Sequence, residues 1–371
     1  MIFKGILLIE SSNEFEEHVN SKNSKNEIFS ILKIVSDNME NSITEYVEKN
    51  ELKKINKEQI AYEWTLDGDR YVILKEKLEE IIAEDKVPVI LIDENTSKKI
   101  IAKQNGGENL LKIFLYKKHN VAEHKEKEFY QINKMFFDNC EYCLHNKSIN
   151  DTYFLIKKLW EIKNIGGGLS RDIILKMIKC DLLISGGTEE NVSNASYDLS
   201  LGDEYYYGGD IRKLNDKKPF VAIEPYDYVI ASCDEKIIMP RDISARFDVS
   251  VNLFCQGIIL SNSTQVDPGF RGKLFCLLFN TSNKVVYLKR KKHFATIEFN
   301  RLIEPSTSYS GKYCDENSIV HYLPENIMQG AINELKKEIE NLKRENQKMQ
   351  SLYLSALAIF LAIISVFLVF K

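Results

Sequence analysis

The residues best suited to chemistry lie in the stretch STQVDPGFRGKLFCLLFN, which covers positions 263–280. Asp267-Pro268-Gly269 predicts a tight turn, because Pro presets its own backbone angle and Gly accepts a positive φ. Asp267 can accept a proton there, or it can simply cap the turn, as aspartate does in many proteins. Gly272 follows, and positions 274–279 are apolar without one acidic residue. This strand therefore offers no second carboxylate for acid-base chemistry.

The elements that position this stretch belong to a chain of 371 residues with a net charge of −4. Domains of roughly 100–200 residues allow two folded units and one extra element. The small net charge argues against a general nucleic-acid binder, and the basic run KRKKH, 289–293, suits a solvated hairpin tip better than a phosphate contact. Seven cysteines without regular spacing indicate a reducing compartment. Cys140 and Cys143 lack a second pair at zinc spacing, so we expect no metal site.

The extra element is an apolar C-terminal segment, 352–370, which contains no charged residue. As a helix it is ~28 Å long at about 1.5 Å per residue, close to the ~30 Å hydrocarbon core of a bilayer. A buried core helix is the alternative, but nothing else here would surround a helix that is apolar on every face. The cations beside it are Lys336, Lys337, Lys343, Arg344 and Lys348 before it and Lys371 after it. The positive-inside rule then predicts a single-pass, tail-anchored membrane protein with cytoplasmic N-terminal domains.

A predicted coiled-coil stalk, 326–350, precedes the span. Its apolar residues recur at spacings of three and four, with the polar Asn346 at one seam position, where it can fix the register. The seam consists of Ile332, Leu335, Ile339, Leu342, Asn346 and Met349. A solvated linker helix is the alternative, because about two and a half heptads is short for a coiled coil.

The first 300 residues show two different patterns. Residues 1–163 alternate the short apolar runs GILLI, VPVILI and LLKIFLY with helical stretches such as 73–84. That alternation predicts an α/β domain with a parallel sheet. The glycine-rich stretch 164–170 predicts a linker. From 195 to 300, short strands alternate with turn signals, as in an all-β barrel or sandwich.

Four segments in the β-rich part carry a family resemblance: LSRDIILKMIKCDLLISGG, ASYDLSLGDEYYYGG, IIMPRDISARFDVSVNLFCQG and VDPGFRGKL. In order and spacing they resemble the dCTP deaminase branch of the dUTPase superfamily, over residues of about 169–302. The resemblance implies a distorted jelly-roll-like barrel, here 164–305, that assembles as a homotrimer with nucleotide sites shared between subunits. We expect the barrel rather than the stalk to set the number of subunits, because its interface would bury more surface.

Carried over residue by residue, the resemblance gives a mixed site. Asp267 matches the aspartate that meets the deoxyribose and, in dUTPases, activates water, so it is catalytic only if the protein is active. Leu277 stands where dCTP deaminases carry the glutamate that shuttles protons on the cytosine ring. The phosphate-binding motif aligns with VSVNLFC, 249–255, where its glycine and both arginines are missing. The ligand-binding positions that the resemblance implies are Ser250, Asp267, Gly269, Phe270 and Gly272.

More weakly, residues 3–162 resemble the guanylate kinase family of P-loop nucleoside monophosphate kinases, through ILLIESSNEF, KIVSDNMENS, YEWTLDGDRYVILKEKLEEII, VPVILID and FFDNCEYCLHN. A phosphate loop should follow the first strand, and it needs glycines and a lysine to hold phosphates. The sequence has no glycine between Gly5 and Gly68. The residues after the first strand are instead Glu10, Glu14, Glu16 and Glu17, which would repel a triphosphate. The alternative is a generic α/β pattern that carries no function.

These observations predict a multidomain chain: a P-loop kinase-like α/β domain, a dUTPase-like all-β barrel, a coiled coil and one transmembrane helix. They favour a membrane-anchored, catalytically degenerate homotrimer that binds or senses a deoxynucleotide or a partner protein. Two alternatives stay open: an active dCTP deaminase or dUTPase-type hydrolase with a site rearranged around Asp267, and a structural trimer that only holds three anchors together. We expect no cofactor, apart from magnesium that accompanies a bound nucleotide, and no nucleic-acid partner.

Overall fold

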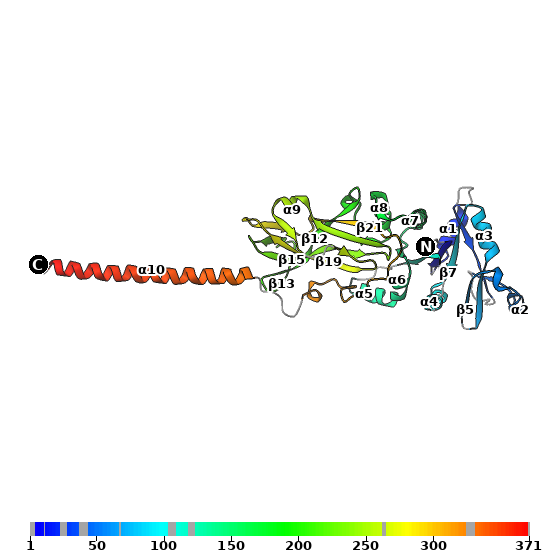
Figure 1. The fold of residues 1–371 in the computed structure, drawn as a ribbon, viewed down its shortest axis with the longest axis horizontal. Coiled ribbons are helices and arrows are strands. Elements are labelled where there is room, and N and C mark those ends of the chain that lie inside the picture. Colours follow the sequence, from blue (N-terminus) through cyan, green and yellow to red (C-terminus); the bar gives the residue numbers. More distant parts are fainter. Residues whose placement is uncertain are drawn as a thin grey trace.

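The protein has three parts along its long axis: an N-terminal α/β domain, a β-rich domain and a long C-terminal helix (Figure 1). The computed structural model describes residues 4–10, 12–22, 28–36, 44–66, 68–102, 109–117, 123–261, 265–323 and 331–369. The five predicted ligand-binding positions lie within these ranges. The side chains of Ile332 and Leu335 in the predicted seam, and those of 365–370 in the predicted span, lie outside the described set.

The N-terminal domain is built on a five-stranded parallel sheet with the strand order β2-β7-β1-β8-β9. The strands are β1 (Gly5–Glu10), β2 (Phe29–Leu32), β7 (Val87–Ile92), β8 (Leu110–Tyr116) and β9 (Tyr142–His145). Every position of β1 and β7 is buried, as expected for strands that are covered on both faces. The predicted parallel sheet is confirmed.

Helices cover both faces of this sheet. They are α1 (Glu14–Ser21), α3 (Lys75–Ala83), α4 (Glu94–Ala102), α5 (Glu123–Ile132), α6 (Lys134–Asn139) and α7 (Ile149–Glu161). Ile6 and Leu8 of β1 share a core with α1 and α7, whereas Leu7 shares a core with α3 and α4. Helices α1 and α7, which follow β1 and β9, therefore cover one face, and α3 and α4, which follow β6 and β7, cover the other. In open α/β sheets, ligands bind beyond the carboxyl ends of the strands where the strand order reverses. Strand β1 lies between β7 and β8, so that position is here the end of β1 at Glu10.

A second, four-stranded sheet has the order β4-β3-β6-β5, which the sequence did not predict. Its elements are β3 (Ile34–Ser36), β4 (Thr44–Tyr46), α2 (Lys49–Leu52), β5 (Ile60–Leu66) and β6 (Asp69–Leu74). Strand β5 and α3 line a groove of about 860 Å³, in which the rings of Tyr62 and Trp64 stack. The groove also reaches Lys4 and Asn109, which stand just before β1 and β8. It therefore lies at the opposite edge of the parallel sheet from Glu10.

Strand β12 holds the two layers of the β-rich domain together, because its first half pairs with β21 and its second half with β15. One layer continues through β16 to β18, and the other through β19 to β17. The elements are α8 (Arg171–Lys179), β11 (Leu183–Ser185), β12 (Ser196–Tyr207), β13 (Asp210–Lys213), β14 (Phe220–Ile223), β15 (Tyr228–Ile238), β16 (Ile243–Val249), α9 (Val251–Cys255), β17 (Ile258–Leu260), β18 (Gln265–Val266), β19 (Arg271–Asn280), β20 (Val286–Lys289) and β21 (His293–Arg301). The predicted succession of short strands between 195 and 300 is confirmed.

The glycine-rich stretch 164–170, predicted as a linker, is part of the β-rich domain. Its β10 (Gly167–Gly168) pairs with β21, and the Leu169 N–H donates to the Phe299 carbonyl at 3.0 Å. The chain enters the sheet a few residues after α7 ends. The boundary between the domains is therefore more constrained than a free linker.

A buried ionic cluster, which we call the junction node, joins the two domains through Tyr142, Asp242 and Arg301. Arg301 donates from Nε to Asp242 Oδ2 at 2.8 Å and from Nη2 to the Tyr142 hydroxyl oxygen at 3.0 Å. Tyr142 on β9 donates its own proton to Asp242, and Arg301 also donates to the Ile162 carbonyl just after α7. All three side chains are buried. Because charges removed from water need their partners, this node holds the two domains in one orientation.

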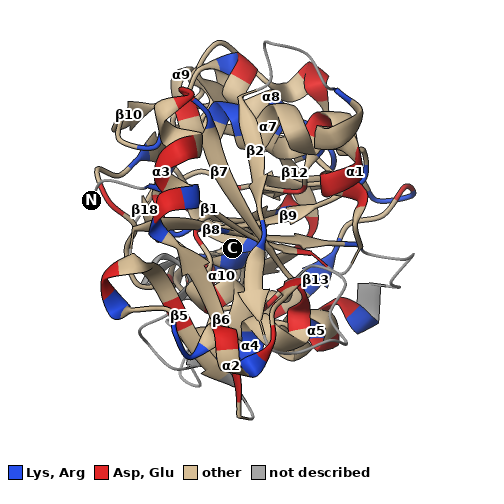
Figure 2. Ribbon diagram, turned by 90° about the vertical axis from the view of Figure 1, so that its right-hand side faces the viewer, with Lys and Arg blue, Asp and Glu red and all other residues tan. Residues whose placement is uncertain are grey.

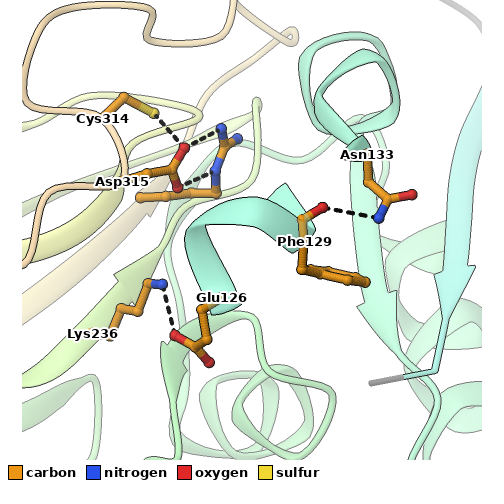
Figure 3. Close-up of polar contacts among 7 residues, drawn as sticks. Glu126, Phe129, Asn133, Lys236, Cys314 and Asp315 are labelled. Atoms are coloured by element: carbon orange, nitrogen blue, oxygen red, sulfur yellow. Dashed lines mark hydrogen bonds and ion pairs between the residues drawn. The ribbon is translucent and has the colours of Figure 1, made fainter. Parts of the chain in front are cut away.

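A second contact, which we call the α5 clasp, ties the N-terminal domain to the start of β19. Arg271 makes two hydrogen bonds to Asp315, at 2.9 and 3.0 Å, and its guanidinium lies over the Tyr130 ring. Lys236 pairs with Glu126 of α5 at 2.9 Å (Figure 3). Burial alone would lower the pKa of Arg271, but the hydrogen bonds to Asp315 outweigh it and raise that pKa. The clasp therefore keeps a permanent cation beside the turn that precedes β19.

The carboxylate of Asp181, just before β11, covers the edge of the parallel sheet at β9. It pairs with His145 at 2.7 Å and with Lys147 at 2.6 Å. Burial would raise the pKa of Asp181, but these two hydrogen bonds outweigh burial and lower the pKa to about 2. Asp181 is thus charged at neutral pH and adds a third polar contact between the domains.

Beyond the barrel, a segment that we call the tail, 305–323, leads toward α10 (Ala331–Val369), one helix of 39 residues. Such a helix is ~58 Å long. From 331 to 369, the predicted stalk and span thus lie in one unbroken helix. Its part Glu338–Ile364 is long and apolar enough to cross a membrane, by length and composition, and is not buried against the rest of the chain. Pairing of the seam with other copies stays a prediction.

We expect Arg301→Met to lower the free energy of unfolding by about 3–5 kcal/mol, because it leaves the Asp242 carboxylate buried without its cation. Urea unfolding followed by circular dichroism measures this. The double variant Asp242→Leu/Arg301→Met removes both charges and should recover much of the loss. Arg171→Met, at a surface arginine of α8, is the control. Equal losses of unfolding free energy in Arg301→Met and Arg171→Met would contradict a structural role for the junction node.

Candidate nucleotide site

The Asp267 turn joins β18 to β19 at the centre of the predicted site. The Phe270 N–H donates to the Asp267 carbonyl at 3.1 Å, and Gly269, at the third position of the turn, has a φ of +77°. Proline at the second position and glycine at the third are the residues that such a turn favours. The Asp267 side chain is exposed, and Gln265 Nε2 donates to its Oδ1 at 2.9 Å. The predicted turn is confirmed, and its carboxylate is accessible.

The tail closes over the inner side of this turn. The ring of Tyr309 meets the buried Phe270 edge-on, with 5.7 Å between the ring centroids. A Cβ at Gly269 would lie 2.1 Å from Ser308 Oγ, and a Cβ at Gly272 would lie 2.7 Å from a carbonyl oxygen of the tail. Within one chain, these three predicted ligand-binding positions therefore contact the tail. Their contact with a ligand stays a prediction.

Ser250 and Leu277 lie at the other end of the barrel. Ser250 precedes α9, which leads into β17, and β17 pairs with β19 beside Leu277. Leu277 itself is half-buried opposite Ile230 of β15. The six residue steps from Arg271 to Leu277 span ~20 Å as an extended strand. Asp267 and Leu277 therefore do not meet within one chain.

Between the two ends, the outer face of β12, β16 and β21 has a hollow of about 490 Å³. It is lined by Ala195, Ser196, Arg246, Phe247, Asp248, Thr296 and Glu298. Arg246 is an exposed cation opposite Gln265, the partner of Asp267, and our sequence reasoning missed it. The outward alternation along β16 was the signal that could have found it. Because Asp248 and Glu298 share the hollow with Arg246, it does not favour a triphosphate.

Metal ligands do not gather anywhere in the described ranges, where no three His, Cys, Asp or Glu side chains come together in a suitable group. Cys140 and Cys143 are buried free thiols. Burial raises the pKa of Cys140 well above its ordinary value. A thiol that stays protonated is a poor metal ligand and a poor nucleophile, so Cys140 is a packing feature of the core.

In the N-terminal domain, a carboxylate stands where a phosphate loop would hold its anion. Glu10, at the end of β1, accepts hydrogen bonds from Ser12 Oγ at 3.0 Å and from the Phe15 N–H at 3.3 Å. The N-terminus of a helix attracts anions, and here a carboxylate of the chain itself takes that position at α1. Burial raises the pKa of Glu10 to about 7 in spite of these bonds.

Other acids surround this position. Glu14 pairs with Lys117 and accepts a hydrogen bond from Asn146 at 3.2 Å. Glu16 and Glu17 lie in the first turn of α1, and Figure 2 shows acidic residues along this helix. The predicted acids therefore lie at the carboxyl end of β1, the position that a phosphate loop would need.

Comparison with known proteins identifies the β-rich domain. A family model described as dCTP deaminase-like matches residues 168–302. The dCTP deaminase of Pyrococcus abyssi is 35% identical over 144 residues, which are 38% of this chain and 92% of that protein. The chain belongs to the dCTP deaminase-like family. The dCTP deaminase of Thermococcus kodakarensis is 36% identical to the dCTP deaminase-like domain over 137 residues, which are 37% of this chain and 87% of that protein.

Two solved structures are similar to separate parts of the chain. A dCTP deaminase from Agrobacterium tumefaciens has a TM-score of 0.33 at 17% identity, covering 37% of this chain and 49% of that chain. A guanylate kinase from Anaplasma phagocytophilum has a TM-score of 0.29 at 14% identity, covering 43% of this chain and 86% of that chain. Such scores carry no argument about function, and the dCTP deaminase-like domain alone supports the inferences below.

We expect Glu10→Gln to stabilise the protein above pH 7 and to leave it nearly unchanged near pH 5. The folded state raises the pKa of Glu10 from 4.5 to about 7, so the stability that protonated Glu10 contributes is lost as the pH rises through 7. Glutamine cannot ionise, and the gain at pH 8 has a ceiling of about 3 kcal/mol. Thermal unfolding from pH 5 to 8 measures it, with Glu17→Gln, at an exposed acid of α1, as the control. A gain in stability that does not depend on pH would contradict the raised pKa of Glu10.

Proposed function

We propose that this protein is a membrane-anchored, catalytically degenerate member of the dCTP deaminase-like family that binds or senses a deoxynucleotide or a partner protein. The observation that carries the proposal is Leu277, half-buried on β19. It stands where the family resemblance expects the proton-shuttling glutamate. A leucine neither accepts nor donates a proton, and general acid-base catalysis is typically worth about 10²–10⁴-fold.

The surface that would hold phosphates supports the same proposal. Helix α9, where the phosphate-binding motif aligns, presents Val251 and Phe254, which are 77% and 64% exposed. Triphosphate binding relies on guanidinium groups and backbone N–H groups. A nucleotide at this surface would therefore depend on contacts to Asp267 of a neighbouring copy and on magnesium that it brings with it. An apolar surface of a partner protein fits α9 equally well.

The separation of Asp267 from Leu277 supports a homotrimer with shared sites. In one chain, the stretch of β19 from Arg271 to Leu277, ~20 Å long, separates the two positions. A site that uses both ends of the barrel therefore needs two copies, the Asp267 end of one and the α9 end of its neighbour. This is the arrangement that the family resemblance implies.

The path from the Asp267 turn to α10 supports a sensing role. The tail touches the turn, since the Tyr309 N–H donates to the Pro268 carbonyl at 2.9 Å. Asp315, further along the tail, holds Arg271 in the α5 clasp. Only residues 324–330 separate the tail from α10. A ligand that shifts the tail would therefore change the position of the helix that we propose as the membrane anchor, in a tail-anchored protein with cytoplasmic domains.

A second candidate, an active enzyme, rests on the exposed carboxylate of Asp267. A scaffold that binds no ligand is the third.

We expect the full-length protein in detergent to convert dCTP and dUTP far more slowly than ~1 s⁻¹, the lower end of ordinary turnover. We expect calorimetry to detect binding of a deoxynucleotide that Asp267→Asn weakens at least tenfold, whereas Asp172→Asn on α8 leaves it unchanged. Ordinary turnover would support the enzyme instead, and no binding at all would support the scaffold.

The proposed trimer should survive without its anchor. We expect a chain that ends at Glu325, without α10, to remain trimeric by light scattering, because a barrel interface of about 2,000 Å² or more outweighs a short stalk. The comparison is the full-length protein with Asn346→Leu in the seam, which should keep the same number of subunits. A monomer or dimer for the shortened chain would show that the stalk sets the assembly.

A further inference from the structure

Cations gather on the ribbon of β14 and β20, a part of the barrel that the proposed function does not use. We call this surface the basic ribbon: Lys217, Lys218, Phe220, Tyr287, Lys289, Arg290, Lys291 and Lys292. Its two segments touch, since the Arg290 N–H donates to the Pro219 carbonyl at 2.8 Å and the Arg290 side chain pairs with Asp216 at 3.2 Å. The small net charge of the chain therefore conceals a local excess of positive charge.

The backbone presents these cations on two fixed tips. The N–H groups of Lys217 and Lys218 both donate to Asn215 Oδ1 at 3.0 Å, which holds the turn before β14. Lys291 has a φ of +57° at the tip between β20 and β21. Within the part of the chain that the structure describes, the five lysines of the basic ribbon form no ion pair. They are therefore available to an anionic partner.

Two aromatic rings stand among these cations on the outer face of the ribbon. Phe220 is 52% exposed and Tyr287 is 63% exposed. Phe220 pairs with Lys289 across the strands, and the Lys289 ammonium lies 5.6 Å from the Phe220 ring centroid. Tyr287 is two residues before Lys289, so both rings share one face at the ~7–8 Å spacing of diagonal neighbours. Exposed rings beside cations are the chemistry that holds unpaired bases and their phosphates.

We propose that the basic ribbon binds single-stranded nucleic acid, with bases on Phe220 and Tyr287 and phosphates on the surrounding lysines. It differs from our expectation of no nucleic-acid partner, which used the small net charge of the chain and took the run 289–293 as a solvated hairpin tip. An anionic bilayer is less suited as the partner. From Ala331 to Ser351, α10 spans ~30 Å before the apolar segment begins, which is several times the ~8 Å Debye length at physiological salt.

Fluorescence anisotropy with labelled 20-nucleotide oligo(dT) and oligo(rU) tests the proposal, using the full-length protein in phosphatidylcholine nanodiscs. We expect Lys291→Glu/Lys292→Glu to weaken binding at least tenfold. The slope of log affinity against log salt should fall by at least about 1.4, because each lost contact to a single strand removes about 0.7. Tyr287→Ala should weaken binding by about 5- to 100-fold and leave the slope unchanged, because stacking involves no ion release.

The matched control is Lys53→Glu/Lys54→Glu, which reverses two exposed lysines of the N-terminal domain and should leave binding unchanged. Circular dichroism and light scattering of each variant establish that fold and assembly are retained. Three results would overturn the proposal. The first is an equal loss of oligonucleotide affinity in the test pair and the control pair. The second is loss of the trimer in Lys291→Glu/Lys292→Glu. The third is binding of the protein to nanodiscs that contain anionic lipid without binding to either oligonucleotide.

Discussion

The buried pairing of Arg301 with Asp242 is the interaction on which the arrangement of the domains depends. Arg301 comes from the last strand of the barrel, yet it also reaches Tyr142 on the edge strand of the parallel sheet and the carbonyl of Ile162 after α7. Such a pair contributes little net stability compared with an apolar contact of the same size, but displacing either partner leaves a charge in a low-dielectric core. The junction node therefore contributes orientation more than stability.

That orientation brings the Asp267 turn and the end of β1 into one structural unit. The Asp267 turn is backed by the tail, and the next residues, through Arg271 and Asp315, are held against α5 of the N-terminal domain. At the end of β1, Glu10 occupies the helix N-terminus that a phosphate would otherwise use. Leu277 on β19 has no proton to transfer, and Glu10 places an acid at the start of α1. Binding coupled to a shape change is the function that we propose for this arrangement.

Much of this architecture follows from local pattern. Uninterrupted apolar strands predict a parallel sheet in the N-terminal domain, because only strands covered on both sides can be apolar on both faces. The Asp-Pro-Gly turn of the β-rich domain follows from the backbone angles that proline and glycine favour. The four-stranded sheet was missed because its strands β3 and β4 have three residues each, too few for a period to show. The tail was missed because its role lies in contacts to Gly269 and Gly272 that no spacing along the chain reveals.

For the candidate site, the sequence by itself determined which chemical groups are present: a carboxylate at Asp267, none at Leu277, and acids in place of a phosphate loop. Residue type and order suffice for that, because a side chain brings its proton chemistry wherever it is placed. Only the tertiary structure decided which of these groups meet. It separated Asp267 from Leu277 along β19, placed Arg246 beside Gln265, and gathered the cations of two distant turns on the basic ribbon. Those outcomes depend on strand pairing between residues far apart in the chain, which is set by the packing of the whole domain.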